Sequence, residues 1–188
     1  MTSTPDVDVV DILTNDHHEV LELIEEIKPT LDPGSRHDMA QTVIAEIMRH
    51  SVAEEMYVYP AMRDHLPDGE SVVQHDIEEH QELEEALKAL EPLQGDDDAF
   101  PATLAKVQDL LRHHASDEET EQFPQLRQHI PAEQLRELGT KVETAKQLAP
   151  TRPHPASPHS ELFHKAFGPG VGFVDKLRDN LTGRARNT

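Results

Sequence analysis

The sequence contains no cysteine, few basic residues and no long apolar run, and each of these shortages excludes a class of function. Without cysteine there are no disulfides, no thiolate metal sites and no cysteine nucleophile, so histidine and carboxylate side chains are the only strong metal ligands. Only 17 basic residues stand against 37 acidic ones, which gives a formal net charge of −20 at pH 7. Such a charge repels phosphate backbones and anionic membranes, so we expect no nucleic-acid partner.

Nowhere do roughly 18 apolar residues follow one another, the length that a membrane helix needs. Residues 1–10 contain neither a basic region nor an apolar run. We therefore expect no membrane span and no signal peptide, which makes the cytoplasm the expected location. The chain also has no glycine-rich phosphate loop and no nucleophile paired with a base, so nucleotide-binding and hydrolase functions have little support.

Apolar residues recur at helical spacing along most of the chain, whereas strand-like alternation and hairpin dipeptides are absent. The fold class should therefore be all-α. Ser35 is the predicted N-cap of the second helix, with Asp38 at the capping-box position. Four long helices with short connections predict an antiparallel up-down four-helix bundle followed by a short fifth helix. The predicted helices cover residues 7–28, 35–63, 71–90, 101–127 and 132–148.

The composition changes after residue 149, where four prolines occur within nine residues. Because proline stops a helix and favours an extended chain, we assign residues 1–149 to the bundle and 150–188 to a linker and tail. Residues 171–181 could form a short amphipathic helix with Lys176 and Arg178 on its polar side. We interpret this tail as docked on its own bundle or disordered, with a membrane or partner contact as the alternative.

Two parts of the chain repeat one another, since residues 50–68 align with residues 114–132, and DHHEV at Asp16 aligns with EHQEL at Glu79. The bundle is therefore interpreted as two related helical hairpins. Each hairpin has a histidine on its first helix and a His-x-x-x-Glu pair on its second. The aligned pairs are His17 with His80, His50 with His114, Glu54 with Glu118, and Glu55 with Glu119.

The His-x-x-x-Glu spacing places both side chains on one helix face, about 6 Å apart along the axis, where they can reach one metal centre. A glutamate in an apolar stripe is costly unless it is paired or bound to a metal. The stripe of the second helix consists of Val43, Ile47, His50, Glu54, Val58 and Ala61. The stripe of the fourth helix consists of Val107, Leu111, His114 and Glu118, and continues less cleanly through Glu121 and Gln125.

The residues at helical spacing around each histidine also distinguish neighbouring histidines, because some share a face with apolar residues and others with acidic ones. His17, His80 and His114 are predicted to point inward, and His18, His75 and His113 to be solvated. One histidine on an apolar face is more often a hydrogen-bonded core residue than a ligand. Four of them on four helices, two with an inward glutamate one turn later, are much harder to explain by packing. The pattern therefore predicts a metal site.

For Tyr57 and Tyr59 in the second helix, and Phe123 in the fourth, we favour a packing role. A tyrosine hydroxyl that lies close to the metal is the alternative.

The motifs DHHEV at Asp16, HSVAEEMYVYP at His50, EHQEL at Glu79 and HHASDEETEQFP at His113 resemble the hemerythrin-like HHE cation-binding domain family over about residues 8–148. The resemblance implies a bundle that holds two non-haem iron ions with an oxo or hydroxo bridge, and manganese or zinc are less favoured. The implied ligands are His17 and His50 for one metal, His80 and His114 for the other, and Glu54 and Glu118 as bridges to both.

The chain departs from the oxygen-carrying hemerythrins, which have two histidines one turn apart on the third helix. Here Asp76 stands one turn before His80 and is a candidate carboxylate ligand, so oxygen carriage by five histidines is not expected. Whether Asp76 or the neighbouring His75 completes the site stays open. Four protein ligands per metal would leave positions open for a small molecule.

The resemblance implies reaction with oxygen, nitric oxide or peroxide, in oxidative or nitrosative stress defence or in sensing. A catalase-like decomposition of peroxide is the enzymatic hypothesis. The alternatives are an iron-binding or storage protein without turnover, and a metal-free helical interaction module.

Overall fold

A computed structural model describes residues 7–149, 151 and 152, and every regular element in those ranges is a helix. The predicted all-α bundle with a short fifth helix is confirmed. The predicted amphipathic segment at 171–181 lies outside the described residues. In chain order the elements are α1 (Val9–Ile27), α2 (Pro33–Ala53), the π-helical turn η1 (Glu54–Val58), α3 (Tyr59–His65), α4 (Gly69–Leu90), α5 (Phe100–Asp117), the π-helical turn η2 (Glu118–Gln122), α6 (Phe123–His129) and α7 (Ala132–Leu148).

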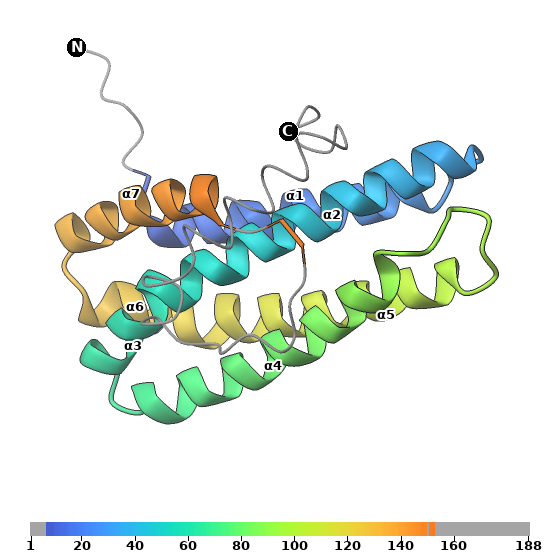
Figure 1. Cartoon of the computed structure of the whole chain (residues 1–188). Coiled ribbons are helices and arrows are strands. Elements are labelled where there is room, and N and C mark those ends of the chain that lie inside the picture. The colour runs from blue at the N-terminus through green and yellow to red at the C-terminus, as the bar shows by residue number, and fades with distance from the viewer. Residues whose placement is uncertain (1–6, 150, 153–188) are drawn as a thin grey trace, which may run out of the picture.

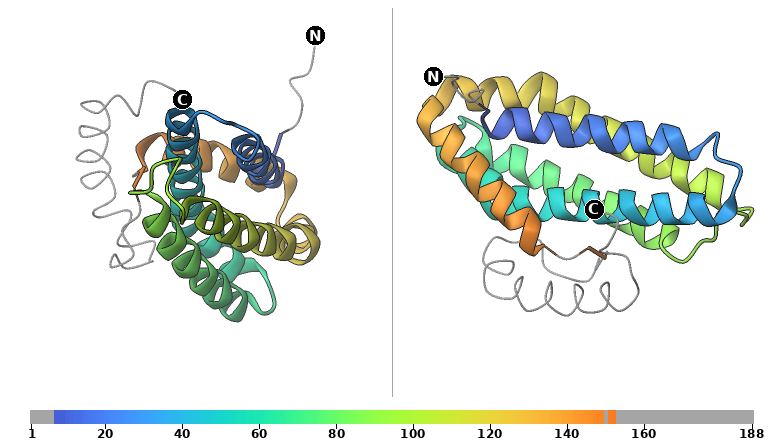
Figure 2. Two further views of the ribbon diagram at one scale, coloured as in Figure 1. Left: turned by 90° about the vertical axis from the view of Figure 1, so that its right-hand side faces the viewer. Right: turned by 90° about the horizontal axis from the view of Figure 1, so that it is seen from above.

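Four rods make the bundle: α1, α2 with η1 and α3, α4, and α5 with η2 and α6 (Figure 1). Around the bundle, α1 contacts α2, α2 contacts α4, α4 contacts α5, and α5 contacts α1. The fifth helix, α7, packs on α1, α2 and η1, and Figure 2 shows it crossing that side of the bundle obliquely. The side formed by α1 and α2 is therefore covered by α7, while α4 and α5 form the other side.

The second rod begins earlier than predicted, because Asp32 rather than Ser35 is its N-cap. The Asp32 carboxylate accepts hydrogen bonds from the Ser35 backbone N–H, at 2.7 Å, and from the Ser35 hydroxyl, at 2.8 Å. Pro33 follows at the first helical position, where its missing N–H has no intrahelical partner to lose. The Ser35 cap was wrong because an aspartate and a proline just before it already form a complete helix start.

Both π-helical turns begin at a repeated glutamate, and each shifts the buried face by one residue. The Tyr59 N–H bonds to the Glu54 carbonyl and the Phe123 N–H to the Glu118 carbonyl, five residues back. After η1 the fully buried residue is Met62, whereas Ala61, which the sequence pattern placed inward, is half-buried. The predicted stripe is wrong at this position because a π-turn inserts one residue into the α-helical period.

The same shift follows η2 in the fourth rod. Gln122 and Leu126 are buried there, rather than the predicted Glu121 and Gln125. The predicted stripe of this helix contained two additional polar residues because the α-helical period was continued through the π-turn.

The apolar core consists of two clusters. The first cluster lies toward α3, α6 and α7 and includes Leu13, Met62 and Leu126. The second cluster lies toward the other end of the bundle and includes Ile24 and Leu87. In every rod, the polar residues that were predicted to face inward occur in the chain between members of the two clusters. The apolar core is thus divided by a buried ionisable layer.

Candidate metal centre

Six polar side chains from the four rods meet in the ionisable layer, and none is more than 4% exposed. The histidines beside them in the sequence point the other way: His18, His75 and His113 are each more than half exposed. The predicted inward and outward orientations are therefore confirmed, while the role of the inward residues as ligands stays a prediction. The buried six are His17 from α1, His50 from α2, Glu54 from η1, His80 from α4, His114 from α5 and Glu118 from η2.

The four buried imidazoles form two pairs through their Nε2 atoms. His17 Nε2 lies 3.1 Å from His50 Nε2, and His80 Nε2 lies 3.3 Å from His114 Nε2. These pairs are the ones that the family resemblance assigns to the two metals. Each pair joins one histidine from the first helix of a hairpin with one from its second helix.

The two buried glutamates lie between these pairs. Glu54 Oε2 is 3.1 Å from His50 Nε2 in one pair and 3.3 Å from His80 Nε2 in the other. Glu118 Oε2 is 3.4 Å from His17 Nε2 and 3.6 Å from His114 Nε2. Each glutamate thus lies between the two pairs, where its carboxylate could contact ions held by both.

A ring of carboxylates holds the outer nitrogen of every buried imidazole. Since a carboxylate only accepts, each Nδ1 carries a proton, and each Nε2 atom faces the centre of the layer. The contacts are His17 Nδ1 to Glu119 at 2.9 Å, His50 Nδ1 to Asp16 at 3.2 Å, His80 Nδ1 to Glu55 at 3.1 Å, and His114 Nδ1 to Glu79 at 3.0 Å.

These four acids were not assigned from the sequence, although the internal repeat carried the signal. It aligns Glu55 with Glu119, each directly after a buried glutamate. It also aligns Asp16 with Glu79, each directly before a buried histidine. Acidic residues at equivalent repeat positions beside candidate ligands are therefore the pattern that identifies such partners.

The surroundings of the two buried glutamates favour a bound cation. Both carboxylate oxygens of Glu54 and both of Glu118 are buried and accept no hydrogen bond. Buried carboxylate oxygens that accept no hydrogen bond are costly, and a bound cation compensates them. The ligand atoms of five of the buried six, all except His80, lie within 4.8 Å of one another. A set of imidazole and carboxylate donors without thiolate suits iron, manganese or zinc.

The electrostatics of the layer favour positive charge. Burial lowers the pKa of His50, but the carboxylates of Glu54 and Asp16 outweigh it and raise that pKa to about 10. Burial also lowers the pKa of His80, but the nearby carboxylates of Glu54 and Glu55 outweigh it and raise that pKa to about 8. Protons thus neutralise the layer in the metal-free protein, and a metal ion would replace them.

Asp76 is fully buried on α4, one turn before His80. Its Oδ1 accepts a 2.8 Å hydrogen bond from the Gln122 amide, while its Oδ2 has no hydrogen-bond partner. Burial, followed by the charge of Glu118, raises the pKa of Asp76 to about 7. An uncompensated buried carboxylate oxygen at this position fits the predicted extra ligand, whereas His75 lies on the exposed face.

The two tyrosines of the second rod differ in their surroundings. The Tyr59 hydroxyl is buried and lies 3.1 Å from His80 Nε2, which supports the alternative of a hydroxyl close to the metal. Tyr57 is half-buried and packs against the first apolar cluster. In the other hairpin Phe123 takes the repeat position of Tyr59 and stacks on His17, with the rings 6.1 Å apart.

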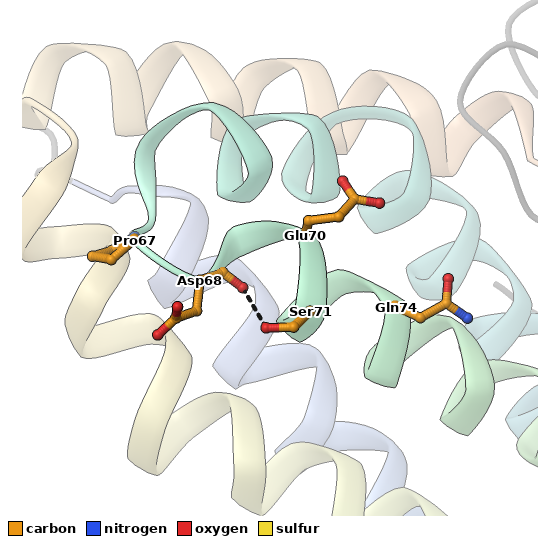
Figure 3. A pocket seen from close by; sticks show the side chains of 5 residues that line it. All are labelled: Pro67, Asp68, Glu70, Ser71 and Gln74. Atoms are coloured by element: carbon orange, nitrogen blue, oxygen red, sulfur yellow. Dashed lines mark hydrogen bonds between the residues drawn. The ribbon is translucent and has the colours of Figure 1, made fainter.

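A surface pocket of about 510 Å³ lies at the turn between α3 and α4 (Figure 3). It is lined by Pro67, Asp68, Glu70, Ser71 and Gln74, and the Ser71 hydroxyl donates a 2.9 Å hydrogen bond to the Asp68 carbonyl. None of these side chains belongs to the ionisable layer. The candidate centre therefore lies in the bundle interior rather than in this pocket.

Residues 8–126 match the hemerythrin HHE cation-binding domain family. The chain belongs to this family. Together with the buried histidine and glutamate cluster, this makes it a metal-binding hemerythrin-like protein. An uncharacterised hemerythrin-like protein from Schizosaccharomyces pombe is 28% identical over 174 residues, which are 92% of this chain and 86% of that protein.

A crystal structure of a hemerythrin HHE cation-binding domain-containing protein from Mycobacterium kansasii has the same fold. It superposes with a TM-score of 0.65 at 20% identity and covers 75% of this chain and 86% of that one. A DNA nickase from a Nostoc species is 25% identical over 142 residues, which are 75% of this chain but only 40% of the nickase. The expectation that this hemerythrin-like protein has no nucleic-acid partner stays a prediction.

None of the helices in the described ranges is long and apolar enough to cross a bilayer. The cytoplasmic location stays a prediction.

Proposed function

We propose that the ionisable layer holds two non-haem iron ions and that the protein binds or reacts with peroxide, oxygen or nitric oxide in stress defence or sensing. The observation that carries the proposal is the pairing of Nε2 atoms, with one glutamate oxygen facing an imidazole of each pair. His17 and His50 would hold one ion, and His80 and His114 the other. Glu54 and Glu118 would bridge the two.

Iron in this layer would supply redox chemistry and Lewis acidity toward a small oxygen or nitrogen ligand. The protein residues supply position and exclusion of water. Each outer carboxylate fixes the orientation of one imidazole through its Nδ1 proton, so the Nε2 atoms converge before any ion arrives. The apolar clusters on both sides keep bulk water away from the layer.

The two halves of the layer differ in their ability to handle protons. Tyr59 and Asp76 lie beside His80, whereas the equivalent repeat positions beside His17 are Phe123 and Leu13. A hydroxyl and a carboxyl can exchange a proton with a small ligand, and an apolar ring or a leucine cannot. The half that contains His80 is thus the one equipped for peroxide chemistry.

The proposal is tested by iron analysis and peroxide consumption with protein produced in iron-supplemented medium. Wild-type protein should contain about two iron ions per chain and decompose peroxide. His17→Ala should lose iron and turnover, whereas His18→Ala, which changes an exposed neighbour on the same helix, should retain both. Iron near zero in a folded wild-type protein would contradict the metal site. Full iron without peroxide consumption would favour the alternative of iron binding or storage.

Mixing the reduced, iron-loaded protein with oxygen distinguishes irreversible oxidation of the iron from reversible oxygen carriage. A carboxylate ligand from Asp76 would favour the ferric state more than a neutral imidazole does, so air should oxidise the iron irreversibly. Stopped-flow spectra after mixing with oxygen should show this oxidation, and azide should then bind to the oxidised protein. A reversible, long-lived oxygen spectrum would indicate an oxygen carrier instead.

A further inference from the structure

A second group of histidines and carboxylates lies on the exposed side of α4 and α5, outside the ionisable layer. Each helix contributes a His-x-x-x-carboxylate pair: His75 with Glu79 on α4, and His113 with Asp117 on α5. His75 Nε2 is 3.5 Å from Glu79 Oε1 and 3.8 Å from Asp117 Oδ2. His113 lies 3.4 Å from Glu79 Oε1 through Nε2 and 3.7 Å from Asp117 Oδ1 through Nδ1. We call these four residues the outer cluster.

The equivalent position in the other hairpin contains a fixed positive charge. Asp16, the repeat partner of Glu79, bonds to His50 and also receives the Lys146 ammonium from α7, with both carboxylate oxygens 2.7 Å from Nζ. The ammonium therefore neutralises a carboxylate that orients a candidate metal ligand. This arrangement depends on α7, whose main contacts are with α1, α2 and η1.

Glu79 likewise orients a buried histidine, but no lysine or arginine of residues 7–149, 151 and 152 forms an ion pair with it. Its Oε2 holds His114 Nδ1 at 3.0 Å, while its Oε1 is buried and accepts no hydrogen bond, although His75 and His113 lie within 3.5 Å of it. Within the described ranges, no helix lies over α4 and α5 as α7 lies over α1 and α2. This buried Glu79 oxygen thus faces two imidazoles that are more than half exposed and the partly exposed Asp117 carboxylate.

We propose that a divalent transition-metal cation binds between His75, Glu79, His113 and Asp117, in the place that the Lys146 ammonium takes in the other hairpin. His75 Nε2 lies 3.5 Å from Glu79 Oε1 and 3.8 Å from Asp117 Oδ2, and His113 Nε2 lies 3.4 Å from the same Glu79 oxygen. These separations are close to the roughly 3.3 Å between donors of a tetrahedral zinc site. One ligand atom each from His75, Glu79 and Asp117 lies within 4.8 Å of the others. Two imidazoles and two carboxylates select zinc or a similar transition metal over magnesium and calcium.

The outer cation is exchangeable, because both imidazoles are more than half exposed. The net charge of −20 raises the local concentration of cations around the chain. The outer site is linked to the ionisable layer through Glu79, which would bind the cation through Oε1 and His114 through Oε2. A cation there draws charge from Glu79 and weakens its hold on His114, which couples the outer site to the centre.

The test is a zinc titration of full-length, iron-loaded protein by equilibrium dialysis, with zinc and iron both quantified. Wild-type protein should bind about one more zinc per chain than the double variant with His75→Ala and His113→Ala. His18→Ala is the matched control, because His18 is equally exposed and lies 3.7 Å from Glu119, which holds His17. This control should bind as much zinc as wild type.

Equal zinc binding by the double variant and wild type would overturn the proposal. Because His113 adjoins His114, the single variant His75→Ala provides a second measurement, in which zinc affinity should fall by about tenfold or more while iron content stays unchanged. An unchanged affinity in this variant would also overturn the proposal. The difference between variant and wild type is equally measurable if the protein contains no iron, so failure of the di-iron proposal would be recognised separately.

Discussion

Asp76→Asn should stabilise the metal-free protein and weaken the metal-loaded one. In the metal-free protein, burial and the charge of Glu118 raise the pKa of Asp76 from 3.8 to about 7. A carboxyl whose pKa is raised by folding stabilises the folded state below about pH 4, and this contribution is lost as the pH rises through 7. The shift corresponds to a loss on the order of 4 kcal/mol. The uncharged amide of asparagine would not incur this loss.

Urea unfolding of chelator-treated protein between pH 5 and 8 measures the effect. The free energy of unfolding of Asp76→Asn minus that of wild type should increase by about 1.4 kcal/mol for each pH unit up to 7 and then level off. The slope of each unfolding curve with urea should be unchanged. Gln122→Leu is a useful control, because it removes the 2.8 Å hydrogen bond to Asp76 but keeps the carboxylate.

The iron-loaded protein should respond in the opposite direction if Asp76 is a ligand. Asp76→Asn should then lower iron content and affinity, since a neutral amide oxygen attracts iron less than a carboxylate does. A variant that is less stable than wild type at pH 8 without metal would refute the reasoning about the buried charge. A variant with unchanged iron affinity would exclude Asp76 as a ligand.

Three further predictions follow from the ionisable layer and the chain end. Glu54→Ala or His114→Ala should lose iron and lower stability by about 3 to 5 kcal/mol, because the remaining partners stay buried; iron analysis and urea unfolding would measure this. Metal binding at pH 7 should release the protons of His50 and His80, whose pKa values are about 10 and about 8, so the calorimetric enthalpy should depend on the buffer; independence of the buffer would contradict this. Truncation after Pro150 should leave the bundle helical by circular dichroism and able to bind iron, whereas iron loss would place a histidine of the tail in the site.

Helix periodicity predicted the bundle well, because burying an apolar stripe is what stabilises each helix. It failed beyond Glu54 and Glu118, where the π-helical turns exchange Ala61 for Met62 and Gln125 for Leu126 on the buried face. A π-turn differs from an α-turn in its hydrogen-bond spacing, which helical periodicity does not reveal. The positions of these turns therefore required the structure.

The buried histidines were predictable for a related reason, because a polar residue inside an apolar stripe stands out. The acids that hold them were harder to find. Glu55 and Glu79 adjoin many other acidic residues, and their role depends on contacts across helices whose crossing geometry the sequence does not contain. Glu79 lies one turn after the exposed His75, yet only 12% of its own side chain is exposed.

The ionisable layer also fixes how far each helix can slide along its neighbours. In the two apolar clusters, leucine, isoleucine and valine contacts are largely interchangeable, so packing alone discriminates weakly between alignments. A slip of one helical turn, about 5.4 Å, would move His80 away from Glu54 and leave a buried carboxylate facing aliphatic side chains. We infer that the layer sets the register of the four rods before a metal ion binds. A bundle with leucine at all six positions should then be more stable yet populate several alignments, which broadened amide resonances would reveal and a single sharp spectrum would contradict.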